Sequence, residues 1–217
     1  MNAFWLRAAQ NFLTVLSCTL AISVGTLTRA ADDSDVIQIE EYWELEVGGP
    51  DANRSAPQVT MIMSPTESLD GDFFAFTVNH WSYPDYAPGG YQLQQWQGDD
   101  CVESRHGWRT SPIAVDGEVI TWVQRLSLDE GQVRFQVLSG HSESWGNFGG
   151  EGFSLSQPSD LGRLNNYRPA TSLNQSGIGY AGNRVSSLTL TRLKWITADG
   201  EVHEMVAPID IDSDLDP

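Results

Sequence analysis

Aromatic and hydrogen-bonding side chains cluster in one short stretch between two predicted strands. The stretch runs from position 79 to 90 and contains Asn79, His80, Trp81, Tyr83, Asp85 and Tyr86. Side chains in a surface loop need not enter the core, so these rings are available for contact with a ligand. Sugars present apolar C–H faces and fixed hydroxyl groups, which suit an aromatic surface with amide, imidazole or carboxylate partners. We therefore predict a binding loop here; the alternative is that the rings cover an open end of the fold.

Two shorter stretches have a similar make-up. In Trp145-Gly146-Asn147-Phe148-Gly149-Gly150, the residues with binding chemistry are Trp145 and Asn147. The other stretch is Arg105-His106-Gly107-Trp108-Arg109, which we also interpret as a loop. Packing within the fold is the alternative for both.

Paired carboxylates are the chemistry that glycoside hydrolysis needs, one as acid and one as base or nucleophile. The segment Tyr42-Trp43-Glu44-Leu45-Glu46 places two acids on the same side of a predicted strand, with Glu40 and Glu41 next to it. Such a run is typical of a solvated outer face, and we interpret all four acids in that way. No catalytic residue is predicted.

Nucleophilic and zinc chemistry find no support in the residue spacing. The sequence contains no Gly-x-Ser-x-Gly, and the segment 140–144, which contains His, Ser and Glu, is interpreted as a turn. The four histidines lie 26, 35 and 62 positions apart, unlike zinc ligands.

Calcium binding stays open. The tail Asp210-Ile211-Asp212-Ser213-Asp214-Leu215-Asp216 has alternate carboxylates, as calcium loops do. An EF-hand loop would have Gly in place of Leu215 and a Glu six residues later. We therefore interpret residues 208–217 as an acidic, unstructured C-terminal tail and predict no cofactor.

The charge balance excludes several partners. The chain has 217 residues, 29 acidic against 12 basic ones, and a formal net charge of −17. Nucleic-acid binding needs a basic surface, and anionic membranes attract basic segments, so neither partner is expected. Hydrophobic residues make up 40% of the chain, which is enough for a core.

The first 30 residues have the pattern of a secretory signal peptide. A basic start is followed by an apolar stretch and by small residues up to Ala30, where we place the cleavage. The remainder is then secreted, extracellular or periplasmic, with no stable membrane span. Removal of Cys18 leaves Cys101 alone, so no internal disulfide is expected. We interpret Cys101 as a buried, small apolar side chain; the alternative is a reactive or intermolecular thiol.

Alternating hydrophobicity predicts strands throughout residues 31–207. The predicted strands cover residues 37–47, 58–63, 74–78, 91–97, 119–128, 133–137, 153–155, 185–193 and 195–205, the last as a hairpin around Asp199-Gly200. A slip of the apolar phase between Leu190 and Leu193 indicates a bulge or burial on both faces. Residues 157–182 are predicted as a long connection with a helical turn near 159–164. The pattern favours an all-β domain, a two-sheet antiparallel β-sandwich or jelly roll.

The hairpin from Thr121-Trp122 to Val137, the segment 144–150 and the late strand 183–195 resemble those of concanavalin-like and laminin-G-like β-sandwiches. These superfamilies contain lectins, carbohydrate-binding modules and some glycan-cleaving enzymes. Concanavalin-like glucanases carry Glu-x-Asp-x-Glu on one strand, and Glu44 and Glu46 supply two of those three acids. The resemblance implies a glycan as ligand, although a fold alone does not establish a function.

Three functions follow as hypotheses. The first is a secreted, non-catalytic module that binds a glycan or another extracellular partner. The second is a structural or adhesion protein of the cell surface, and the third is a divergent glycan-active enzyme.

The charge of the exported part generates a prediction. Residues 1–30 hold two of the twelve basic residues, Arg7 and Arg29, and no acidic one, so the remainder carries −19. Salt screens the self-repulsion of such a charge. The melting temperature of residues 31–217 should therefore rise between about 0.1 M and about 1 M NaCl, and further with CaCl₂ if calcium binds. A melting temperature that is unchanged by both salts would contradict the idea.

Overall fold

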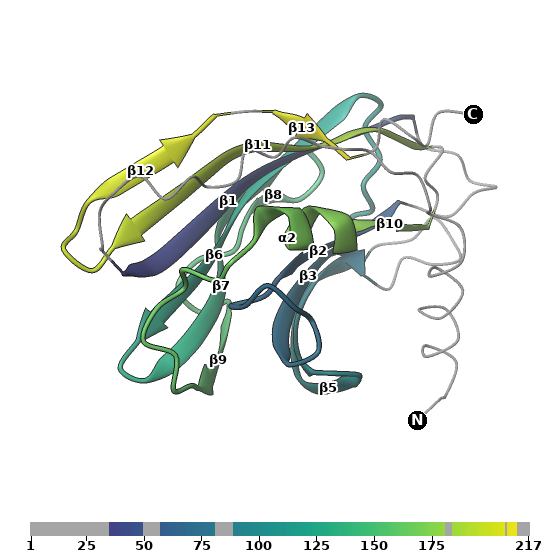
Figure 1. The fold of residues 1–217 in the computed structure, drawn as a ribbon. Helices are drawn as coiled ribbons and strands as arrows, with labels where there is room; N and C mark the ends of the chain where they lie inside the picture. Colours follow the sequence, from purple (N-terminus) through teal and green to yellow (C-terminus); the bar gives the residue numbers. More distant parts are fainter. Residues whose placement is uncertain (1–34, 50–56, 81–88, 181–183, 207, 212–217) are drawn as a thin grey trace. The chain divides into compact units, whose positions relative to one another are not determined.

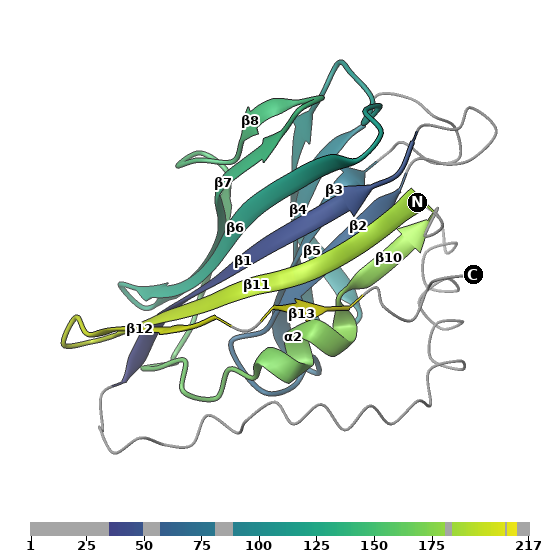
Figure 2. The same cartoon turned by 90° about the horizontal axis from the view of Figure 1, so that it is seen from above.

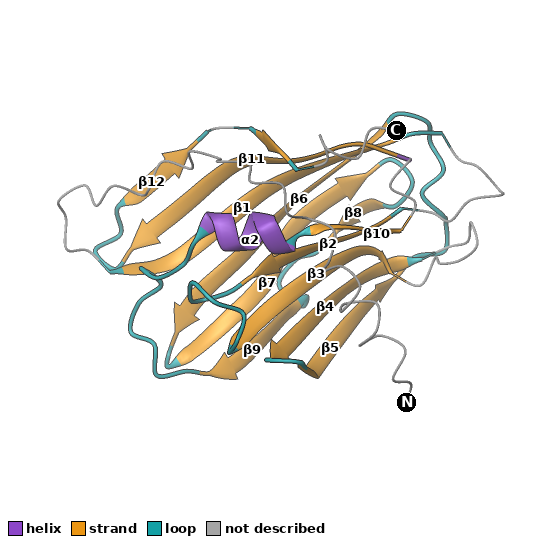
Figure 3. Ribbon diagram, turned by 45° about the vertical axis from the view of Figure 1, so that its right-hand side comes forward, coloured by secondary structure: helices purple, strands orange, loops and turns teal. Residues whose placement is uncertain are grey.

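The computed structural model describes residues 35–49, 57–80, 89–180, 184–206 and 208–211, and these form two antiparallel β-sheets and one short helix (Figures 1 and 3). Sheet A consists of β1 (Val36–Val47), β6 (Glu118–Asp129), β7 (Gln132–Ser142), β8 (Gly146–Phe148), β9 (Ser154–Pro158), β11 (Val185–Thr197), β12 (Val202–Met205) and β13 (Ile209–Asp210). Sheet B consists of β10 (Gly177–Tyr180), β2 (Gln58–Met63), β3 (Asp72–His80), β4 (Gly90–Gln97) and β5 (Asp100–Trp108), in that spatial order. The prediction of a two-sheet antiparallel sandwich is confirmed.

The core lies between the two sheets. Figure 2 shows β6, β1 and β11 in front of β2, β3 and β4. Alternate residues of the central strand β1 face inward, and Trp43 stacks on Trp122 of β6 with ring centroids 6.2 Å apart. Phe76 of β3 packs against the same Trp122 at 5.8 Å, which joins sheet B to sheet A. Burial of these large rings removes apolar surface from water and holds the two layers together.

A two-residue turn between β6 and β7 sets the register of these two strands. Asp129 pairs with Gln132, and the two residues between them, Glu130 and Gly131, both have positive φ. Positive φ at both positions is the mark of the type I′ turn, whose twist matches that of the flanking strands. The predicted bulge in β11 is confirmed as well, because Tyr42 pairs with Arg192 while Trp43 pairs with Leu190. Thr191 is therefore the extra residue.

The edge strand β5 was predicted wrongly as a loop at residues 105–109. Nearly every residue of β5 is exposed, so the alternation that marks a half-buried strand is missing from its sequence. The prediction for Cys101 is also wrong, because this free cysteine is exposed on β5. Partial burial raises the pKa of its thiol, while a hydrogen bond from Gln94 acts in the opposite direction.

The predicted connection 157–182 contains more structure than expected. No helix forms at 159–164; instead, α2 spans Pro169–Gln175 and leads into β10. Pro169 starts the helix, where a missing N–H costs nothing, and Leu173 is buried in the core. The Ser172 and Ser176 hydroxyl groups bond to the backbone of Ile62 in β2. Tertiary contacts of this kind, which local propensity does not reveal, place the helix.

The two ends of the chain are described only in part. The predicted signal peptide lies outside the described residues, as do positions 212–217 of the predicted tail. The prediction of an unstructured tail is wrong for Ile209 and Asp210, which form β13 and pair with Leu190 and Thr189 of β11. In the described part of the chain, no helix has the length and apolar character needed to cross a membrane. The described residues all belong to one compact unit that spans residues 33–217.

Gly140 of β7 provides a test of the packing. It is paired with Phe148, and a Cβ atom at position 140 would lie 2.1 Å from the Phe148 ring. Forcing the ring aside costs about 1–3 kcal/mol. Gly140→Ala should lower the free energy of unfolding by this amount in denaturant titrations. Gly152→Ala is the matched control, because nothing lies within 4 Å of that position. Equal stability of the two variants would contradict the packing described here.

Candidate functional site

Most of the predicted binding loop lies outside the described residues, namely Trp81, Tyr83, Asp85 and Tyr86. Its two ends are described. His80 ends β3 and pairs with Gly90 of β4, and Gly90 in turn pairs with Trp108 of β5. Asn79 is completely buried, and its amide donates a hydrogen bond to the Pro57 carbonyl oxygen at 2.7 Å. Asn79 therefore anchors the end of β3.

The second predicted site separates into a packing residue and a surface residue. Trp145 is 9% exposed, packs with its ring edge on Phe148 and donates from its indole nitrogen to the Ser111 carbonyl oxygen. Asn147 of β8 is exposed. The packing alternative thus describes Trp145, while Asn147 stays available for a ligand.

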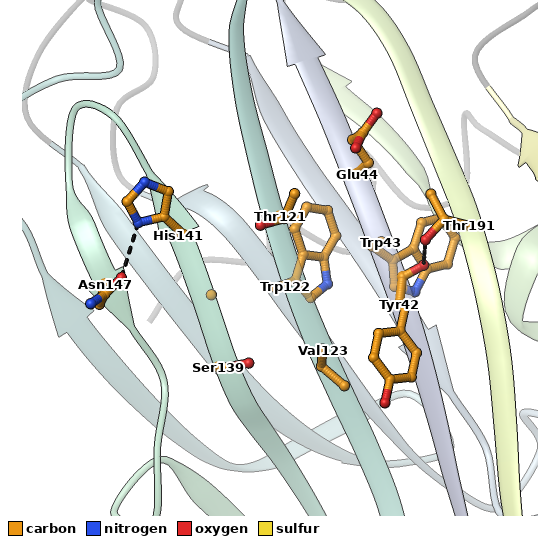
Figure 4. A pocket seen from close by; sticks show the side chains of 11 residues that line it. Tyr42, Trp43, Glu44, Thr121, Trp122, Val123, Ser139, His141, Asn147 and Thr191 are labelled. Atoms are coloured by element: carbon orange, nitrogen blue, oxygen red, sulfur yellow. Dashed lines mark hydrogen bonds between the residues drawn. The ribbon is translucent and has the colours of Figure 1, made fainter.

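Asn147 borders a depression on the outer face of sheet A, which we call the outer depression (Figure 4). Its volume is about 370 Å³. Its lining comes from five neighbouring strands: Tyr42, Trp43, Glu44, Thr121, Trp122, Val123, Ser139, Gly140, His141, Asn147 and Thr191. Sequence reasoning identified one member of this set as a site residue, Asn147. Trp43 and Trp122 are themselves core residues. The remaining members that face outward alternate with core residues along their strands, so orientation was their only signal.

Two β-bulges border the outer depression. Thr191 is the extra residue of β11, and its hydroxyl donates to the Tyr42 carbonyl oxygen at 3.0 Å (Figure 4). In β7, Val123 pairs with Ser139 while Gln124 pairs with Val137, so Leu138 is the extra residue. Bulges bend a strand and redirect its side chains, and they are frequent next to binding sites.

The outer depression combines hydroxyl groups, an imidazole, an amide and a carboxylate. His141 Nδ1 lies 2.9 Å from Asn147 Oδ1, so with the amide oxygen as acceptor the ring carries its hydrogen on Nδ1. Nε2 of the neutral ring is then an acceptor for a ligand hydroxyl. Glu44 adds carboxylate oxygens on β1, and Thr121 adds a hydroxyl on β6, directly opposite Glu44 in the register.

A buried carboxylate positions the turn before Asn147. Glu118 is 2% exposed, and it accepts hydrogen bonds from the Ser144 backbone N–H at 2.9 Å, from the Ser144 hydroxyl at 2.6 Å and from the Ser142 hydroxyl. These bonds hold the turn at residues 143–145. The prediction of a turn over 140–144 is wrong for residues 140–142, which belong to β7. Ser142 is buried while its neighbour His141 is exposed, so the two do not form a nucleophile–base pair.

The prediction that Glu40 lies on a solvated face is wrong. Glu40 faces outward but is only 3% exposed, because neighbouring side chains cover it. Arg125 of β6 reaches it at 2.8 Å and Lys194 of β11 at 3.3 Å, and Tyr42 donates a hydrogen bond at 2.9 Å. Burial alone would raise the pKa of Glu40, but the hydrogen bonds from Tyr42 and Arg125 and the charges of Arg125 and Lys194 outweigh burial and lower it.

The same prediction is also wrong for Glu41, which is completely buried between the sheets. Its carboxylate accepts from the Trp43 indole at 2.9 Å, from the Gln124 amide at 2.7 Å and from the Tyr167 hydroxyl. Burial raises the pKa of Glu41, and the hydrogen bonds, including one from Ser172, only partly oppose this. Burial and the nearby Glu41 also raise the pKa of Tyr167.

The described residues contain no cluster of side chains suited to a metal ion. No group of three or more His, Cys, Asp or Glu side chains occurs there in an arrangement that could hold a metal ion. Of the acidic tail, for which calcium binding stayed open, Asp210 is described, and its carboxylate accepts a hydrogen bond from the Leu188 backbone N–H. The other tail acids lie outside the described residues.

Comparison of the chain with models of known protein families, and with curated protein sequences, finds no match.

The two adjacent acids predict opposite pH dependences. A raised pKa in the folded state means that the contribution of Glu41 to stability is complete below the unfolded pKa, near 4.5, and is lost as the pH rises through the folded pKa. Glu41→Gln removes this loss. Relative to wild type, the variant should therefore gain stability in urea titrations as the pH rises above about 4.5.

Glu40→Gln is the matched control on the other face of the same strand. The lowered pKa of Glu40 means that its contribution is present above the unfolded pKa and is lost as the pH falls through the folded pKa. The free energy of unfolding of the variant should be about 1–3 kcal/mol lower than that of wild type near neutral pH, and the difference should be smaller in acid. This magnitude lies between the values for exposed and buried ion pairs. Parallel pH profiles for the two variants would contradict the assignments.

Proposed function

We propose that this chain is a secreted, concanavalin-like β-sandwich module that binds an extracellular glycan without cleaving it. The ligand site is the outer depression on sheet A. The observation that carries the proposal is the set of hydrogen-bonding groups gathered there from five strands around a hollow of about 370 Å³. Signal-peptide cleavage and export are part of the same proposal, and they rest on the sequence of residues 1–30.

The lining suits sugar hydroxyl groups in number and kind. His141 Nε2 and the Glu44 carboxylate are acceptors, while the hydroxyls of Thr121 and Ser139 both donate and accept. Carboxylate–hydroxyl hydrogen bonds are stronger than those between neutral groups. The size of the outer depression lies at the lower end of the usual range for ligand pockets, which fits one or two sugar rings.

Binding is favoured over hydrolysis by the carboxylates available. Cleavage of a glycosidic bond needs two of them on opposite sides of the bond. Of the two candidates from the sequence, Glu44 lines the outer depression and Glu46 does not. Glu40 forms ion pairs with Arg125 and Lys194, and Glu41 is completely buried in the core, so neither can supply the second carboxylate.

The proposal is tested by titration calorimetry and polysaccharide pull-down on residues 31–217 with a panel of glycans. Glu44→Gln and Asn147→Ala should each weaken binding about tenfold, the effect of losing one charge-assisted or well-placed hydrogen bond. Glu46→Gln is the control, since it removes the next outward acid of β1 and should leave affinity unchanged. Failure of the wild type to bind any glycan, or equal affinity of all four proteins, would overturn the proposal.

A further inference from the structure

The outer face of sheet B differs in composition from the rest of this acidic chain. Outward positions are the alternate residues of β2 over 58–62, β3 over 73–77 and β4 over 92–96, whose neighbours face the core, and of β5 over 104–108, which pair with the outward positions of β4. Cross-strand contacts confirm the orientation, because Thr60 and Thr77 share a hydrogen bond of 3.0 Å and Phe73 stacks on Trp96. None of these twelve described positions is Asp, Glu, Lys or Arg.

The outer face of sheet A, unlike that of sheet B, carries charged residues. The outer face of sheet A carries Glu44 and Glu46 as well as the ionic cluster of Glu40, Arg125 and Lys194. On β5 the charged Glu103 and Arg105 project to the other side, where they pair with each other and Arg105 reaches the Gly152 carbonyl oxygen. The chain has 29 acidic residues, yet the outer face of sheet B carries no charge at these positions. A neutral or apolar ligand can therefore bind there, whereas an anionic ligand finds no cation to pair with.

Aromatic side chains lie at both ends of this face. Phe73 and Trp96 are parallel within 1°, with centroids 5.9 Å apart. His106 and Trp108 are parallel within 7°, with centroids 5.3 Å apart, and Trp108 is 63% exposed. Parallel rings at these separations are offset from one another, so each leaves part of a face uncovered by its neighbour.

The spacing between the two aromatic pairs is set by the strands. Trp96 pairs with Cys101, and Trp108 pairs with Gly90, six residues away along β4. At the rise of a β-strand this separates the two tryptophans by about 20 Å. Gln94 and Ser104 lie between them and offer uncharged donors and acceptors, while Gln92 is 6% exposed and contacts His106 at 3.2 Å.

We infer that this face is a second binding surface, for an extended, uncharged polysaccharide that runs along β4 and β5 and stacks on Trp96 and Trp108. The inference rests on the proposed glycan-binding function, but it concerns a different sheet and a different shape of ligand. An extended chain of several sugar rings can contact both aromatic pairs, while the Gln94 amide and the Ser104 hydroxyl between them bond to its hydroxyl groups. A ligand without charge meets no unpaired ion here, so its binding carries no ionic desolvation cost.

The test is affinity electrophoresis and pull-down of residues 31–217 with neutral polysaccharides (cellulose, β-glucan, mannan and chitin) and with an anionic one, alginate. Trp108→Ala and Gln94→Ala should weaken binding to a neutral polysaccharide, the former about tenfold, as expected for the loss of one aromatic contact and its buried area. Binding should be unchanged between about 0.1 M and about 0.5 M NaCl, because no charge pairing is involved. Trp195→Ala is the matched control, since Trp195 stacks on His203 at 5.3 Å on sheet A in the same kind of pair.

Parallel measurements on Glu44→Gln separate this inference from the proposed function. Loss of polysaccharide binding in Trp108→Ala but not in Glu44→Gln supports the second surface. Loss in Glu44→Gln alone keeps the proposed function and overturns the inference. Preference for alginate, or a monomer–dimer equilibrium that Trp108→Ala abolishes without polysaccharide binding, would also overturn it, the latter by assigning the face to a second copy of the chain.

Discussion

Strand β1 must accommodate two adjacent buried carboxylates that point in opposite directions, and much of sheet A depends on how it does so. Glu40, on the outer face, bridges β6 and β11 through Arg125 and Lys194. Glu41, on the inner face, bonds to Gln124 of β6 and to Tyr167 of the segment before α2. A shift of one residue in the register would exchange the two faces and leave both acids without their partners. The pair therefore fixes β1 between its neighbours, and with it the position of Glu44 in the outer depression.

The alternation of residue types predicted much of the fold. Wherever one face of a strand is buried and the other wet, as at Val133, Phe135 and Val137, the pattern has period two and the strand is found in place. Strand β5 has no buried face, and β8, β10 and β13 are four residues or fewer, so none of them produces such a pattern. The helix α2 depends on contacts with β2, more than 100 residues away in sequence, which local propensity cannot supply.

The candidate sites were harder to predict than the fold. Charged residues are presumed to be exposed, and Glu40 and Glu41 violate that rule because each has at least three hydrogen-bonding or ionic partners, two of them outside β1. Alternation alone would have placed Glu41 with Ile39 and Trp43 in the core. The outer depression depends on bulges in β7 and β11, and only the second leaves a trace in the sequence, as the slip between Leu190 and Leu193. The uncharged face of sheet B becomes visible only once the cross-strand register is known.

The bond between Glu41 and Tyr167 has a consequence for the order in which the chain assembles. The two residues are 126 positions apart, so Glu41 is made long before its partner. Until the segment before α2 docks, the space between the sheets cannot close over that carboxylate without leaving it short of a donor. Contacts between residues far apart in sequence slow folding, so we expect the sandwich to be completed late. A fragment that ends before Tyr167 lacks this donor for Glu41.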